Sequence, residues 1–250
     1  MQRLNSKLRA CLLLAWASTA FAIPAYAIDG PTWARQASPL DIRCSSPARN
    51  IASPDKVWTA QVTCHTRKDD DPIYSLRVTD KAGRMFDVPL RERSQELLWA
   101  PDSTAFLVNG SQAGYWGFFV DVYNVTANGV DRHEVTDLAQ RDMVTSFPPC
   151  RAANSDKVSC ARVTKNPQYN MSGLGWASDS RSIFIFAEVP CSSSYGGIMC
   201  QVLGYQVRIP DGVLLARLTS VQVKAQWSDL MAWPMHIPDP PIYGADLTPR

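Results

Sequence analysis

Short apolar runs rich in Val, Ile, Phe, Tyr and Trp alternate along the chain with turn-forming Gly, Pro, Asp, Asn and Ser. Long stretches with a helical period of 3.6 residues are nearly absent, and runs of this length and composition are typical of β-strands. The pattern therefore predicts an all-β protein built from antiparallel sheets. The predicted strands cover residues 57–64, 73–79, 84–90, 96–99, 104–109, 117–125, 130–138, 182–189, 201–209, 213–218 and 222–227.

Turn dipeptides and loop-rich segments separate these runs. Asp80-Lys81-Ala82-Gly83, Asn128-Gly129 and Pro210-Asp211-Gly212 are typical hairpin connections. Residues 140–171 are rich in Pro, Asn, Ser and Lys and predict one long loop, and the Pro-rich residues 233–250 predict an extended tail. Residues 28–232, which include the 140–171 loop, are enough for one domain with a substantial core or for two small ones.

A short element recurs between predicted strands. Leu98-Trp99-Ala100-Pro101-Asp102-Ser103 matches Gly175-Trp176-Ala177-Ser178-Asp179-Ser180, and Ser53-Pro54-Asp55-Lys56 is a weaker copy. Each copy predicts a strand end, a tight turn and a new strand, because Asp binds the amides of its own turn. We expect Asp55, Asp102 and Asp179 to fill that role.

This signature resembles the repeats of TolB-like β-propeller proteins of the bacterial periplasm, over residues 50–125 and 172–228. The resemblance implies propeller-like blades, each a four-stranded sheet. Because the signature occurs two or three times in the chain, the expected architecture is a partial propeller or a multi-sheet sandwich. An open arc of three sheets and a ring completed by another chain are both compatible with it.

The amino terminus has the organisation of a secretory leader. Arg3, Lys7 and Arg9 precede an apolar run over residues 10–22, and Ala25-Tyr26-Ala27 is a small-x-small cleavage pattern. The run is shorter than the roughly 20 residues of a membrane span. We therefore expect residues 1–27 to be a cleaved signal peptide and the protein to be periplasmic or secreted.

The charge balance excludes two classes of partner. The chain contains 25 Lys and Arg against 23 Asp and Glu, and the expected cleavage removes three of the basic residues, Arg3, Lys7 and Arg9. A mature surface close to neutral offers no electrostatic footprint for nucleic acid or for anionic lipid. No later segment is apolar enough to predict a membrane span.

Cysteine usage agrees with export. Of the seven cysteines, Cys11 leaves with the leader, and an even number in an exported chain predicts three disulfides. Local grouping favours pairing within each of Cys44/Cys64, Cys150/Cys160 and Cys191/Cys200. Metal-binding spacings such as C-x2-C are absent from the sequence, so we expect neither zinc nor another cofactor.

Candidate catalytic residues are few. His65, His133 and His236 are far apart in sequence, and Gly110-Ser111-Gln112-Ala113-Gly114 only approximates a nucleophile motif and favours a flexible hairpin loop. The run Asp69-Asp70-Asp71 lacks the alternating ligand spacing of a calcium loop and predicts a solvated turn. The sequence therefore favours a non-enzymatic role.

Aromatic residues in small-residue loops suggest a binding surface. Tyr115 and Trp116 lie in a Gly-rich loop, and Tyr195 lies in a Ser/Gly segment bracketed by cysteines. Such residues commonly anchor protein or sugar partners, although Tyr115 and Trp116 could equally turn inward to cap the core. The other tryptophans singled out, Trp58, Trp99, Trp176 and Trp227, are expected in the core or at the interfaces between blades.

Three functions remain compatible with the sequence. The preferred hypothesis is a binding or assembly module of the cell envelope that recognises a protein partner through its loops and could form oligomers. The first alternative is an envelope hydrolase acting on glycan or peptide, which would need Asp121 or Glu134 to converge with His133. The second is a secreted inhibitor or immunity protein.

Overall fold

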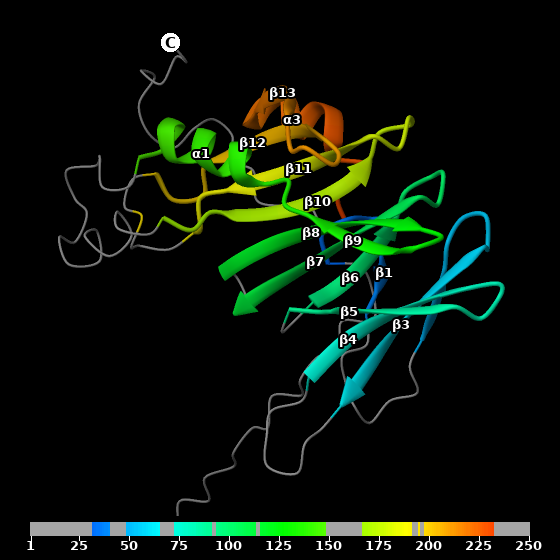
Figure 1. The fold of residues 1–250 in the computed structure, drawn as a ribbon. Helices are drawn as coiled ribbons and strands as arrows, with labels where there is room; N and C mark the ends of the chain where they lie inside the picture. The colour runs from blue at the N-terminus through cyan, green and yellow to red at the C-terminus, as the bar shows by residue number, and fades with distance from the viewer. Residues whose placement is uncertain are drawn as a thin grey trace, which may run out of the picture.

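The computed structural model describes residues 32–40, 49–65, 73–91, 94–113, 116–148, 167–191, 195 and 198–232. The expected leader, the expected tail at 233–250 and Asp69–Asp71 lie outside these residues. The described part contains three antiparallel sheets stacked one upon another (Figure 1), which confirms the predicted all-β, multi-sheet class.

The first sheet, here sheet 1, has the strand order β2-β3-β4-β5. Its strands are β2 (Asn50–Ala52), β3 (Trp58–His65), β4 (Ile73–Asp80) and β5 (Met85–Pro89). Each strand pairs with its neighbour in sequence, so the sheet is an antiparallel meander. One face is apolar, with Val62, Leu76 and Val78 buried against sheet 2. Sheet 1 occupies the lower end of the stack in Figure 1.

Sheet 2 lies in the middle of the stack. Its meander comprises β6 (Ser94–Trp99), β7 (Ala105–Ala113), β8 (Trp116–Thr126) and β9 (Gly129–His133), and the short β1 (Ser38–Pro39) pairs with β6. Both faces are buried, which explains the continuous apolar run Ala105–Val108 in the first half of β7. Phe106 and Val108 face sheet 1, and Leu107 faces sheet 3.

Sheet 3 repeats the four-stranded meander. It comprises β10 (Asn170–Trp176), β11 (Ser182–Glu188), β12 (Val202–Arg208) and β13 (Leu214–Thr219). Ile183, Ile185 and Tyr205 pack against sheet 2 in the largest core cluster. Each sheet thus contains the same four-stranded meander, and a recurrent Asp turn joins the first two strands of each meander.

Two helices occur where the sequence predicted other structure. Helix α1 (Asp137–Ser146) begins inside the strand predicted at 130–138 and continues into the predicted 140–171 loop. Its buried side chains are Ala139 and Met143, one turn apart, so its apolar stripe is too narrow to give a visible helical period. The residues 149–166 of that predicted loop lie outside the described part.

Helix α3 (Ser220–Trp227) replaces the strand predicted at 222–227. Thr219 and Gln222 form a capping box, in which each side chain accepts a hydrogen bond from the other residue's amide. Val223 and Trp227 are four residues apart and both buried, which is helical spacing. The predicted strand was therefore wrong because a two-residue helical stripe was read as alternation.

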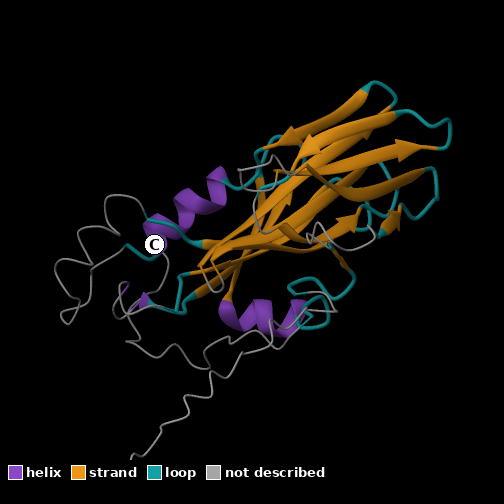
Figure 2. Ribbon diagram, turned by 90° about the horizontal axis from the view of Figure 1, so that it is seen from below, coloured by secondary structure: helices purple, strands orange, loops and turns teal. Residues whose placement is uncertain are grey.

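Helix α3 covers the face of sheet 3 that points away from sheet 2 (Figures 1 and 2). A Cβ added at Gly204 of β12 would lie 2.4 Å from Trp227 and 2.5 Å from Val223, so the helix packs directly on the backbone of the strand. The amino-terminal residues join the same cluster, since Trp33 packs there beside Met231 and Ala34 forms a bridge to Met231.

Candidate functional site

The connections between strands fall into two groups at opposite ends of the sheets. Because each sheet is a meander, alternate connections emerge at the same end. At one end, which we call the turn end, all connections between paired strands are tight turns, visible together in Figure 2. These turns are residues 53–57, 80–84, 100–104, 127–128, 177–181 and 209–213.

The opposite end carries the longest connections between paired strands, residues 66–72 and 189–201, together with the short connections 90–93 and 114–115, and we call it the long-connection end. Phe147, directly after α1, and Tyr169, directly before β10, also meet there, because the Tyr169 hydroxyl donates to the Phe147 carbonyl at 2.6 Å. These two residues flank the segment 149–166. The topology therefore places the described residues that flank the longest connections at one end of the sheets.

At the turn end, each recurrent Asp binds its own turn as the sequence predicts. The Oδ1 atoms of Asp55, Asp102 and Asp179 accept the amide two residues later, at 2.9, 3.0 and 2.9 Å. Hydrogen bonds from the Ser53 hydroxyl and the Val57 amide lower the pKa of Asp55. The turns are therefore closed by their own side chains, and these Asp residues act in local structure.

The same turns are also joined to one another. Ser103 Oγ accepts the Asp55 amide at 3.1 Å, and Ser180 Oγ accepts the Asp102 amide at 3.1 Å. Ser103 and Ser180 both have positive φ, 64° and 58°, which directs their side chains toward the preceding turn. Both serines belong to the repeated motif, but the sequence does not predict their hydrogen bonds to the neighbouring sheets.

The recurrent tryptophans form a second set of bonds between sheets. Trp99 Nε1 donates to the Ile51 carbonyl at 3.4 Å, and Trp176 Nε1 donates to the Leu98 carbonyl at 3.1 Å. Each indole thus donates a hydrogen bond to the first strand of the meander in the preceding sheet. Trp99 is buried and Trp176 is half-buried at a seam, as expected for core residues.

A buried polar centre lies where the amino-terminal segment meets sheet 2. Glu96 is fully buried, and its Oε2 accepts the amides of Thr32 and Trp33 at 2.6 and 3.1 Å. Its Oε1 accepts the Ala34 amide at 3.0 Å and the Asn109 side-chain amide at 2.7 Å. Burial raises the pKa of Glu96, whereas these four hydrogen bonds favour the ionised form.

Asn109 connects this centre to sheet 3. Its Nδ2 also donates to the Gly173 carbonyl at 2.7 Å, and its Oδ1 accepts the Gly173 amide at 2.8 Å. Gly173 allows this close approach, because a Cβ there would lie 2.9 Å from Leu107. The roles of Glu96 and Asn109 were not predicted, because each residue lies at the border between an apolar run, 97–99 or 105–108, and a polar stretch of the same strand.

The residues required by the hydrolase alternative do not converge. Asp121 is buried and forms ion pairs with Arg91 at 3.1 Å and Arg132 at 2.6 Å. His133 pairs with Val122 in the β8–β9 ladder, so it lies on the opposite face of sheet 2 from Asp121. Glu134 is half-exposed and lies 3.6 Å from Arg132. The side chains of His65 and His236 lie outside the described part.

The predicted aromatic binding residues have different environments. Tyr195 is a core residue, 2% exposed, and its ring packs against Tyr169 with centroids 6.0 Å apart. Its hydroxyl donates to the Gln168 carbonyl and accepts the Gln168 amide. Trp116 begins β8 at the long-connection end. Tyr115 and the Trp116 side chain lie outside the described part.

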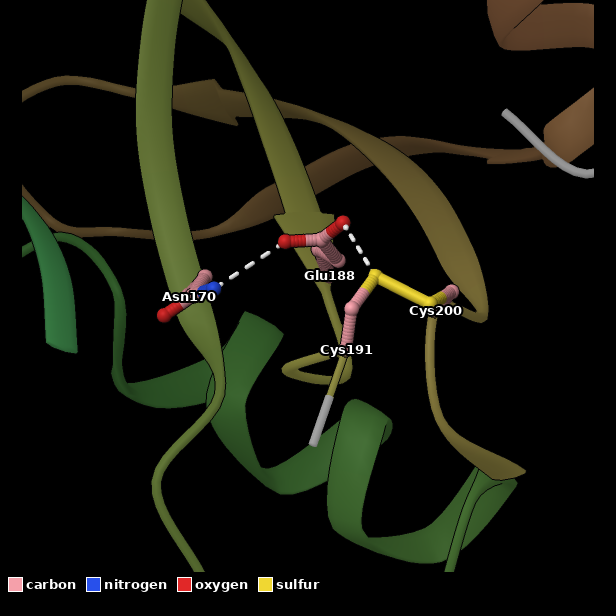
Figure 3. The surroundings of a disulfide bond; sticks show 4 residues. All are labelled: Asn170, Glu188, Cys191 and Cys200. Carbon is pink, nitrogen blue, oxygen red and sulfur yellow. Dashed lines mark hydrogen bonds between the residues drawn. A yellow bond between two sulfur atoms is a disulfide. The ribbon is translucent and has the colours of Figure 1, made fainter. Parts of the chain in front are cut away.

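One of the predicted disulfides is complete in the described part (Figure 3). Cys191 and Cys200 are bonded, with their Cα atoms 4.6 Å apart. Glu188 Oε1 lies 3.4 Å from Cys191 Sγ, and Glu188 Oε2 accepts a hydrogen bond from Asn170 at 3.0 Å. Cys64 is also disulfide-bonded. Cys44, Cys150 and Cys160 lie outside the described part.

The described residues contain neither a cluster suited to a metal ion nor a helix suited to crossing a membrane. No group of three or more His, Cys, Asp or Glu residues there has an arrangement that could hold a metal ion. Among the helices described, none has the length and apolar character needed to cross a membrane.

Comparison with known proteins adds no family: no family model matches the chain, and no curated protein matches it. The fold and the site together define a protein of three stacked antiparallel sheets, disulfide-bonded, with its long connections at one end.

Proposed function

We propose that the protein is an exported binding or assembly module of the bacterial cell envelope, TolB-like in its repeats, which holds a protein partner at its long-connection end. The observation that carries the proposal is the asymmetry between the two ends of the sheets. The turn end is closed by short turns that bind one another, whereas the opposite end presents the long segments.

The sheets provide a rigid scaffold for such a role. Seams bonded through Trp99, Trp176, Ser103 and Ser180 fix each sheet relative to the next. Binding residues are commonly carried by loops on a scaffold of this kind, because loops tolerate variation that core strands do not. Recognition by loops also agrees with the near-neutral charge balance, which gives no general attraction to polyanions.

Export is supported by the disulfide chemistry. The chain contains the Cys191–Cys200 disulfide. Such bonds persist in oxidising compartments outside the cytosol. The leader-like residues 1–27 give the route, and the periplasm is the compartment that the TolB-like repeats favour.

Affinity capture tests the proposal. The oxidised chain without residues 1–27 is immobilised and exposed to a bacterial envelope extract, and retained proteins are identified by mass spectrometry. A variant with Tyr115→Ala and Trp116→Ala at the long-connection end is expected to lose about tenfold or more in affinity for the retained partner.

The matched control carries Lys81→Ala and Asn128→Ala, two exposed positions at the turn end. We expect it to bind as the unmodified chain does, with both variants keeping their melting temperature. Loss of binding in the control and not in the Tyr115/Trp116 variant would refute the assignment of the binding end.

A further inference from the structure

The Cys191–Cys200 bond closes a loop whose interior returns to the core. The backbone at the base of the loop continues the β11–β12 ladder, since Val189 accepts the Cys200 amide at 2.9 Å and donates to the Gln201 carbonyl at 2.8 Å. Beyond this base the chain leaves the sheet, and Tyr195 and Ile198 are buried again in the cluster between sheets 2 and 3. The disulfide therefore closes a segment that supplies two core side chains, Tyr195 and Ile198.

Tyr195 connects the segment closed by the disulfide to the residues just before β10. Both the amide and the carbonyl of Gln168 bond to the Tyr195 hydroxyl, and Tyr169 stacks beside it. Tyr169 in turn bonds to Phe147 at the end of α1. One aromatic pair thus holds both the end of α1 and the beginning of β10, through residues that are 22 positions apart in the chain.

The bond is also open to chemical attack. Cys191 is exposed, whereas Cys200 is half-buried, so an incoming thiolate reaches the Cys191 sulfur first. Figure 3 shows the Glu188 carboxylate beside that sulfur, at 3.4 Å. A negative charge at this distance repels an approaching thiolate and, once the bond is open, can accept a hydrogen bond from the Cys191 thiol.

We infer that the Cys191–Cys200 bond is a redox-sensitive tie: closed, it keeps Tyr195 in the core and holds the end of α1 against the beginning of β10; opened by a dithiol, it releases both. In the opening step, one thiolate of the dithiol attacks Cys191 Sγ and expels Cys200 as a thiolate, which takes a proton from water. The second thiol then displaces Cys191, so the protein gains two electrons and two protons and the reductant leaves as a disulfide. The regulatory meaning of the tie rests on the proposed function.

Hydrogen exchange at Gln168 tests the tie independently of any partner, because the amide of Gln168 donates to Tyr195. In a Cys191→Ser, Cys200→Ser variant, we expect this amide to exchange about tenfold or more faster, with the β11 amides of Ile183 and Ile185 unchanged. Treating the unmodified chain with dithiothreitol should give the same acceleration. Unchanged exchange at Gln168 in the variant would overturn the tie.

Two further variants sharpen the test. Cys64→Ser, which opens a disulfide in sheet 1, should leave Gln168 exchange as it is. Glu188→Gln should be reduced several-fold faster by dithiothreitol at low salt, since it lacks the repelling charge. Equal reduction rates would remove Glu188 from the inference.

Partner capture separates the tie from the proposed function. Capture by the oxidised chain and loss in the double Ser variant would support regulation of binding. If Gln168 exchanges faster in the double Ser variant but capture is unchanged, the disulfide does not regulate binding. If Gln168 exchanges faster and the Tyr115/Trp116 variant still binds the partner, the proposed function is refuted and the tie stands.

Discussion

Asn109 shows how much a single side chain contributes to the junction of sheet 2, sheet 3 and the amino-terminal segment. It satisfies both backbone groups of Gly173 in sheet 3 and one oxygen of Glu96, which holds the amino-terminal segment. All of these groups are buried, so none can turn to water if Asn109 is removed. The junction therefore depends on an amide with one acceptor and two donor hydrogens at this position.

Replacing Asn109 with Ala should lower the free energy of unfolding by about 2 to 4 kcal/mol, because it leaves buried polar groups without partners. Urea unfolding measures this loss. Asn124→Ala is the matched control on the neighbouring strand β8, where the side chain is half-buried and makes no hydrogen bond found among the described residues, and it should change stability by about 0.5 kcal/mol or less. Equal losses in the two variants would contradict the role of Asn109.

Tyr123 gives the fold a dependence on alkaline pH. Burial, with a smaller effect from Asp121, raises the pKa of Tyr123 to about 12. The unfolded chain, with an ordinary phenol pKa near 10, releases this proton earlier, so stability is complete below about pH 10 and falls as pH rises toward 12.

Tyr123→Phe should therefore reduce the loss of stability between about pH 10 and 11 by roughly 1 kcal/mol. Urea midpoints measured from pH 8 upward test this, and the two proteins should show parallel pH dependence between pH 8 and 9. The same slope above pH 10 in both proteins would refute the assignment. Burial also raises the pKa of Tyr169 and Tyr205, so part of the slope remains in the variant.

At the scale of elements, turn chemistry was the most reliable guide. The Asp55, Asp102 and Asp179 turns lie between strands as predicted, because Asp binds amides that only a tight turn brings within reach. Both helices were missed, since each buries only two side chains and further apolar residues, such as Leu138 in α1 and Val221 in α3, are exposed and blur the helical period. Thr219 and Gln222 carried a readable capping-box signal for α3.

The contact between α3 and β12 depends on Gly204. A methyl group there would overlap the Trp227 and Val223 side chains, which are themselves fixed in the core. Gly204→Ala should therefore displace α3 and lower the free energy of unfolding by about 1 to 3 kcal/mol. Thermal and urea unfolding both report this loss.

Gly175→Ala provides the comparison for Gly204→Ala. A Cβ at Gly175 would have its nearest neighbours at 3.7 Å, an ordinary contact distance. This substitution should be tolerated within about 0.5 kcal/mol. A loss at Gly175 as large as that at Gly204 would show that the effect comes from glycine replacement in the sheet and not from the helix contact.

At the scale of the whole molecule, the two outermost sheet faces differ from the inner ones. Sheets 2 and 3 turn Phe106, Val108, Ile183 and Ile185 toward the preceding sheet. The corresponding outward face of sheet 1 is polar and partly exposed, as expected for a terminal repeat. It carries Thr59, Gln61, Thr63, Ser75, Arg77 and Thr79. At the other end, α3 covers sheet 3, so the stack is finished on both sides.

The face of sheet 2 that packs on sheet 1 is apolar. Giving the outer face of sheet 1 similar apolar side chains should make the protein self-associate. In a Thr59→Phe, Gln61→Val variant we expect concentration-dependent dimers, measured by sedimentation velocity, because an exposed apolar sheet face favours association. Ala127→Phe adds one aromatic residue at the exposed turn end and should not change the association state. A variant that sediments as the unmodified chain does would contradict the terminal role of this face.

The sequence predicted most of the longer strands and the repeat turns, because these depend on local chemistry, but it gave no strand for β1, β2 or β10. It did not predict how Glu96 would meet residues 32–34 or how Asn109 would meet Gly173, since these partners are more than 60 residues apart. Tyr195 illustrates the same limit: a Ser/Gly setting suggested display on a loop, and the fold buries the ring against Tyr169. Long-range placement follows from the sheet stack and not from the neighbours in the chain.

The central claim is that a partner binds at the long-connection end, and site-specific photo-crosslinking tests it most directly. A photoreactive residue is placed at Ile73 or Met199, both exposed at that end, or at Lys81 or Asn128 at the turn end. In the native envelope, positions 73 and 199 should crosslink to the same protein, and positions 81 and 128 should not. Crosslinks to one protein from positions 81 and 128 alone would contradict the claim.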